Sequence, residues 1–146
     1  MFNLREAIEN ISIRWRYKLD RLPSDVYRID VAIKVGENKF RYQLVYIWQI
    51  PDRYFGKPVI FMNSRCGEYS PNLNLYHLLK EAGYGTLSTI TVTTDKKSDG
   101  SPCETVVCQA AIPVEFVNEH ILDKTIFEVA YNADVVEEKY FGGDTN

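Results

Sequence analysis

The sequence lacks the features that mark membrane and secreted proteins. Its 146 residues contain no apolar run of about 18 residues or more, so no transmembrane span is expected. Met1-Phe2-Asn3 passes directly into a mixed-charge segment, without the basic and apolar regions of a secretory signal. The expected compartment is therefore the cytoplasm, and no membrane partner is expected.

Cysteine and histidine are also scarce. Cys66, Cys103 and Cys108 form an odd set without a C-x-x-C pair, which favours reduced thiols over a disulfide. With two histidines, the chain lacks three or four metal ligands at a recognisable spacing, so neither a metal nor a cofactor is expected. Cys66 follows Arg65 in a Gly-containing segment and is the one candidate nucleophile. An ordinary loop thiol is the favoured interpretation.

No other motif supplies catalytic chemistry. The glycines at 83, 85, 142 and 143 do not lie between a strand and the start of a following helix, as a phosphate-binding loop would. Asp134, Glu137 and Glu138 are interpreted as a solvated helix face rather than a carboxylate pair. We therefore predict no catalytic residue, and the protein is not expected to be an enzyme.

What is present indicates a globular domain. The chain is 45% hydrophobic and 25% charged, close to the globular average, and its length suits one domain over 1–146 with 142–146 as a loose tail. Aromatic residues make up 13% of the chain, including ten tyrosines. Because tyrosine is amphipathic, this abundance favours half-buried sheet faces or interfaces.

Charge is divided unevenly along the chain. Residues 1–65 contain twelve Lys and Arg against seven Asp and Glu, a balance of +5, and residues 66–146 contain five against thirteen, a balance of −8. The two halves can attract each other within one chain or between copies. Arg14, Arg16 and Lys18 form a basic row that suits a solvated face or a docking site for an acidic helix. Nucleic-acid binding, through Arg14, Arg16, Arg28 and Arg41, is a weaker interpretation because the chain is not basic overall.

The N-terminal pattern leaves two interpretations open. Asn3 can cap a short helix in which Leu4, Ala7, Ile8 and Ile11 share one face. Residues 11–19 then alternate apolar and polar side chains, which favours a strand. A helix that continues to about Leu19 also fits, because Leu4, Ile8, Ile11 and Trp15 lie on one face.

The remaining pattern predicts an α+β fold. Strands are expected from the alternating segments 27–35, 40–50, 87–94 and 104–112 and from the apolar run 59–62, with helices at 75–82 and from about Asn118 to Phe141. The segment 40–50 is apolar on both faces in its middle, which indicates a central strand. The predicted order is α-β-β-β-β-α-β-β-α: an antiparallel sheet of about five to six strands with helices packed on it.

The closing helix carries two apolar rows. On a helical wheel, Ile126, Val129, Ala133, Val136 and Tyr140 all fall within about 40° of Leu122, and this row can cover the sheet. Phe127, Tyr131 and Val135 follow one another at i, i+4 and i+8 on nearly the opposite side. This second row is either buried under the N-terminal segment or forms a dimer or partner interface.

The second half of the chain resembles a known family. The segments Val59-Ile60-Phe61-Met62-Asn63-Ser64, Leu75-Tyr76-His77-Leu78-Leu79, Ala111-Ile112-Pro113 and Phe127-Glu128-Val129-Ala130-Tyr131-Asn132-Ala133-Asp134 are similar to the YbjN-domain family and the wider type III secretion chaperone-like fold. The resemblance is strongest over residues 59–141 and implies non-enzymatic dimers that bind polypeptides or act in regulation. The Arg-rich N-terminal region departs from that pattern.

Two functional hypotheses follow. The first is a non-catalytic, chaperone-like or regulatory protein-binding domain that acts as a homodimer, with a protein or peptide as partner. The alternative is a small-molecule enzyme or ligand-binding domain whose pocket uses Arg65, Cys66, Tyr69 and the aromatic strand Tyr42-Tyr46-Trp48.

Overall fold

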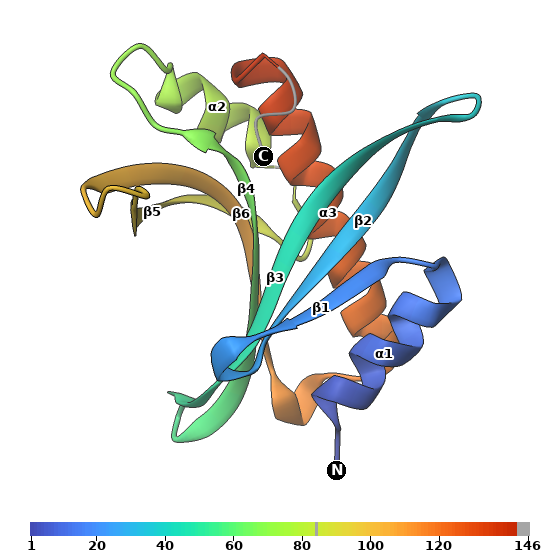
Figure 1. Cartoon of the computed structure of the whole chain (residues 1–146). Helices are drawn as coiled ribbons and strands as arrows, with labels where there is room; N and C mark the ends of the chain where they lie inside the picture. Colours follow the sequence, from blue (N-terminus) through green and yellow to red (C-terminus); the bar gives the residue numbers. More distant parts are fainter. Residues whose placement is uncertain (84, 143–146) are drawn as a thin grey trace.

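A computed structural model describes residues 1–83 and 85–142. It contains an antiparallel sheet of six strands and three helices, in the predicted chain order (Figure 1). The elements are α1 (Leu4–Trp15), β1 (Lys18–Leu22), β2 (Val26–Gly36), β3 (Lys39–Tyr54), β4 (Lys57–Glu68), α2 (Leu75–Ala82), β5 (Thr89–Lys96), β6 (Pro102–Pro113) and α3 (Glu119–Tyr140). Short 3₁₀ turns cover Pro23–Asp25 and Val114–Phe116.

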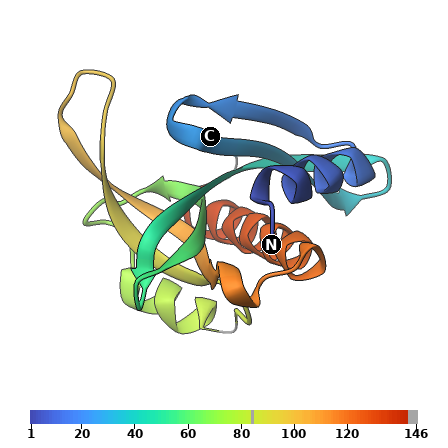
Figure 2. The same cartoon turned by 90° about the horizontal axis from the view of Figure 1, so that it is seen from below.

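The strand order in the sheet is β1-β2-β3-β4-β6-β5. The first four strands form a meander of antiparallel neighbours, and β6 adds to β4, which leaves β5 at the far edge. The prediction that the segment 40–50 lies in a central strand is confirmed, since β3 pairs with β2 on one side and β4 on the other. The sheet is strongly twisted and curves around α3 (Figure 2).

All three helices lie on one face of the sheet. Helix α3 contacts β2, β3, β4 and β6, whereas α1 packs near its start and α2 near its end (Figure 1). The alternation of apolar residues along the strands places one set of side chains under α3, and these make one continuous core with the helix. The fully buried members include Ile29, Ile47, Ile60, Met62, Leu122 and Ala133.

The opposite face of the sheet carries aromatic side chains. Tyr42, Tyr46 and Trp48 alternate with the inward residues of β3, and Trp48 pairs in register with Phe61 of β4. The rings of Trp48 and Phe61 stack with centroids 6.1 Å apart. Tyr42 is exposed, and Trp48 and Phe61 are half-buried.

The favoured strand over residues 11–19 is wrong for most of the segment, of which only Lys18 and Leu19 lie in a strand, β1. Helix α1 continues through this segment to Trp15 and ends at Arg16, whose φ of 58° lies in the left-handed region. Ile11 is fully buried while Ile13 is 76% exposed, so the two side chains do not share a face as they would in a strand. The helical spacing of Leu4, Ile8 and Ile11 toward the core prevails over the local alternation.

The predicted cap at the N-terminal end is confirmed. Asn3 accepts a hydrogen bond from the amide of Glu6 and caps α1 as expected. Of the predicted loose tail 142–146, residues 143–146 lie outside the described part of the chain. None of the helices within the described ranges has the length and apolar character needed to cross a bilayer.

Candidate functional site

Helix α3 presents a row of apolar side chains to solvent. Phe127, Tyr131 and Val135 are 43%, 47% and 42% exposed, and we call these three residues the outward row. The rings of Phe127 and Tyr131 stack, with centroids 6.1 Å apart and an interplanar angle of 24°. The alternative that the N-terminal segment buries this row is not what the structure shows, because α1 packs near the start of α3 instead.

The helix that carries the row is well defined at its N-terminus. Asn118 caps it by accepting a hydrogen bond from the amide of Ile121 at 2.8 Å. The opposite side of α3 is buried against the sheet through Leu122, Ile126, Val129 and Ala133, as the first apolar row predicted. The outward row is therefore fixed in direction by the burial of the other side.

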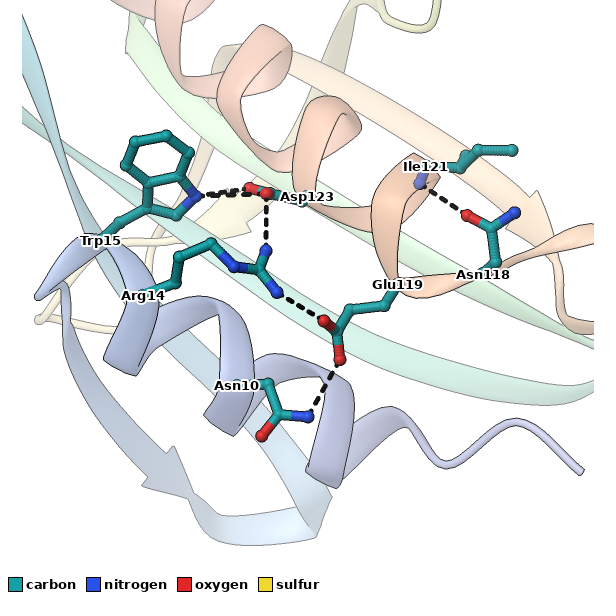
Figure 3. A network of polar contacts seen from close by, with 7 residues as sticks. All are labelled: Asn10, Arg14, Trp15, Asn118, Glu119, Ile121 and Asp123. Atoms are coloured by element: carbon teal, nitrogen blue, oxygen red, sulfur yellow. Dashed lines mark hydrogen bonds and ion pairs between the residues drawn. The ribbon is translucent and has the colours of Figure 1, made fainter.

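Polar contacts with α1 hold the start of α3. Arg14 donates to Asp123 at 2.9 Å and to Glu119 at 2.5 Å, and the indole of Trp15 donates to Asp123 (Figure 3). Asn10 adds a hydrogen bond to Glu119 at 3.0 Å. The hydrogen bonds to Glu119 and Asp123 raise the pKa of Arg14 above its usual value. Of the two interpretations of the basic row, a solvated face or a docking site for the acidic helix, the second holds for Arg14.

A second basic residue holds the middle of α3. Arg41 of β3 forms a bidentate ion pair with Asp134, a residue that is only 4% exposed. The hydrogen bond to Asp134, opposed in part by desolvation, raises the pKa of Arg41. The positive first half of the sequence is therefore joined to the negative second half inside one chain.

The end of α3 is anchored by α2 and β4. Glu81 of α2 accepts hydrogen bonds from Lys139 and Tyr140. These bonds lower the pKa of Glu81 to about 2, and the pKa of Tyr140 rises to about 12 through desolvation and its bond to Glu81. The ring of Phe141 lies against Gly67, where a Cβ atom would come within 2.3 Å of it.

The turn before β5 packs along one flank of the outward row. Glu128 accepts hydrogen bonds from the amide of Leu87 and the hydroxyl of Ser88, each at 2.7 Å. Asn132 donates to the same hydroxyl at 2.9 Å. Leu87 is itself exposed, so it adds apolar surface on this flank.

The interpretation of Asp134, Glu137 and Glu138 as one solvated face is wrong in two positions. Asp134 and Glu137 are buried, and only Glu138 is exposed. The spacing of these acidic residues in the sequence did not indicate that Asp134 is buried, because its partner Arg41 lies 93 residues earlier in the chain. Buried Asp123, bound by Arg14 and Trp15, was missed for the same reason.

The structure places the candidate nucleophile in the core. Cys66 is completely buried, and burial raises the pKa of its thiol, whereas nucleophilic catalysis needs a lowered pKa. Tyr42, Tyr46 and Trp48 lie on the other face of the sheet, so they do not share a pocket with this thiol. Cys108 is buried with a pKa raised to about 11, and Cys103 is half-buried.

Other candidate ligands are dispersed. His77 and His120 are exposed, and His77 lies 3.1 Å from Glu81 on the same helix. Within the described ranges, no three His, Cys, Asp or Glu side chains gather in a way that could hold a metal ion. Arg14, Arg28 and Arg41, named for nucleic-acid binding, each form an ion pair within the chain.

The surface also has hollows. One hollow with a volume of about 660 Å³ lies between the start of α1 and the 3₁₀ turn after β1, with Arg5, Arg21, Asp25 and Gln49 in its lining. A smaller hollow of about 150 Å³ lies beside α3, where Ser88, Cys108, Asn132 and Val135 line it. Neither is lined by Cys66.

The chain was also compared with known proteins. No protein-family model matches it, and no curated protein matches it.

Proposed function

We propose that the protein is a non-catalytic, chaperone-like or regulatory protein-binding domain that acts as a homodimer in the cytoplasm. One observation carries this proposal: Phe127, Tyr131 and Val135 stand exposed, in line, on a helix that is fixed on its other sides. Aligned and exposed apolar side chains of this kind are typical of an association surface, because covering them with a partner removes apolar surface from water and lowers the free energy.

The aromatic face of the sheet is the proposed site for a protein or peptide partner. The helices cover the other face, so Tyr42, Trp48 and Phe61 remain available to a second polypeptide. Tyrosine and tryptophan are enriched at protein interfaces because they combine a large apolar area with a polar group. The resemblance of residues 59–141 to type III secretion chaperone-like proteins supports the same function.

The experiment is a measurement of mass against concentration. Sedimentation equilibrium is expected to show a reversible monomer–dimer transition, and Phe127→Glu is expected to weaken it at least about tenfold, because a charge would have to be buried at the contact. Tyr76→Glu is the matched control, since Tyr76 is an exposed aromatic residue on α2. A strict monomer at about millimolar concentration, or equal dimerisation of Phe127→Glu and the original chain, would contradict the proposal.

A further inference from the structure

The outward face of α3 has a symmetric arrangement about Tyr131. Phe127 lies four residues before Tyr131 and Val135 four residues after it, or about 6 Å along the helix in each direction. Lys124 lies seven residues before and Glu138 seven residues after, about 10 Å in each direction. All five side chains are exposed, so the face carries a positive end, an apolar middle and a negative end.

The other charged groups beside this face are engaged within the chain. Glu128 binds the turn before β5 and Lys139 binds Glu81. Lys124 forms no ion pair or hydrogen bond with the rest of the described residues. Glu138 comes within 4.0 Å of Arg41, whose guanidinium is already bound to Asp134.

This charge pattern distinguishes the two ways in which a second copy of α3 could pack here. A parallel pair would place Lys124 beside Lys124 and Glu138 beside Glu138, so both ends would repel. An antiparallel pair centred on Tyr131 would place each Lys124 beside Glu138 of the other copy. Phe127 would then lie at the level of Val135, and the two Tyr131 side chains would meet at the two-fold axis.

We propose that the partner of the outward row is a second copy of this chain, packed with α3 antiparallel to α3 about a two-fold axis at Tyr131. The inference rests on the proposed homodimer and specifies its geometry. Such a contact is isologous: the same five residues serve both copies, so the assembly closes at two. Because a contact centred on one helix pair is small, we expect a Kd in the micromolar range or weaker.

The first test is a charge-reversal cycle measured by sedimentation equilibrium at low salt. Lys124→Glu and Glu138→Lys, each alone, place two like-charged pairs in the dimer, so each should raise the Kd about tenfold. The double variant restores both attractions with reversed signs and should return the Kd to within about threefold of the original. Lys80→Glu, a matched reversal of an exposed lysine on α2, should leave the Kd unchanged.

The second test reads the helix orientation directly. In a Cys103→Ser background, Phe127→Cys and Val135→Cys proteins are mixed and treated with a short bis-maleimide. The antiparallel arrangement predicts efficient cross-links in the mixture and few in either protein alone, because identical positions are separated along the axis by about 12 Å. A parallel pair would cross-link each protein with itself. Circular dichroism of every variant checks that these exposed substitutions leave the fold intact.

The results of the two tests distinguish failure of the homodimer from failure of the antiparallel packing of α3. A monomer at all concentrations would overturn both the homodimer and this arrangement. A dimer whose Kd is unchanged by the charge reversals would overturn the antiparallel arrangement alone. Efficient cross-linking of the Phe127→Cys protein with itself would do the same. Rescue by the double variant together with the mixed cross-link would support it.

Discussion

The guanidinium of Arg41 on β3 forms a bidentate ion pair with the carboxylate of Asp134 on α3. Nε lies 2.9 Å from Oδ1, and one terminal nitrogen lies 2.7 Å from Oδ2. Asp134 is buried, while about a third of Arg41 is exposed to solvent. This pair joins the centre of the sheet to the middle of the helix that carries the outward row.

Arg41→Ala is therefore expected to destabilise the fold. Without Arg41 the carboxylate of Asp134 is left buried and unpaired, which we expect to lower the free energy of unfolding by about 2 kcal/mol after allowance for partial solvent access. Urea unfolding measures the change. Arg28→Ala is the matched control, because its pair with Asp20 is a third exposed on both sides and should contribute less to stability than the pair with buried Asp134. Equal losses in the two variants would contradict the prediction.

The contact of Glu81 with Lys139 and Tyr140 should make the docking of α2 sensitive to acid. The pKa of Glu81 is lowered from 4.5 to about 2 in the folded state, so its contribution to stability is complete above pH 4.5 and is lost as the pH falls toward about 2. Glu81→Gln should be less stable than the original chain at neutral pH. The difference should shrink across this window, as urea unfolding at a series of pH values would show. A difference that stays constant from pH 6 to about 2 would contradict this assignment.

Thiol reactivity tests the alternative hypothesis of a site near Cys66. Cys66 and Cys108 are buried, and burial raises the pKa of both thiols, whereas Cys103 is half-buried on β6. We expect iodoacetamide at pH 8 to modify Cys103 first, and the other two only on the timescale of unfolding. Peptide mass mapping identifies the modified residue. Rapid modification of Cys66 in the folded protein would instead favour a reactive thiol.

The sequence predicted the fold better than it predicted the contacts. Alternation along the strands and helical spacing in α3 depend on which side of an element faces the core, and that property is local. The favoured strand over 11–19 was wrong because two local patterns competed there, and the helical spacing of Leu4, Ile8 and Ile11 prevailed over the short alternation. The long-range contacts of the same segment could not be predicted. Arg14 and Trp15 bind Asp123, more than 100 residues later. No local pattern contains that information.

The same limit applies to the candidate site. The helical wheel predicted that Phe127, Tyr131 and Val135 share a face, but their exposure depends on where α1 lies. The burial of Asp134 depends on Arg41, which its neighbours in the sequence do not reveal. A basic half and an acidic half of one chain were the only hint that such pairs exist.

The position of α3 after all six strands in chain order bears on how the protein folds during synthesis. The inward residues of β2, β3 and β4 acquire their helical cover only when residues 119–140 have left the ribosome. Arg14 and Arg41 can likewise form their ion pairs only after Asp123 and Asp134 have been synthesised, about 90 to 110 residues later. The core of the sheet thus cannot be completed before α3 has been synthesised, and until then the inward apolar side chains of these strands lack the cover of α3.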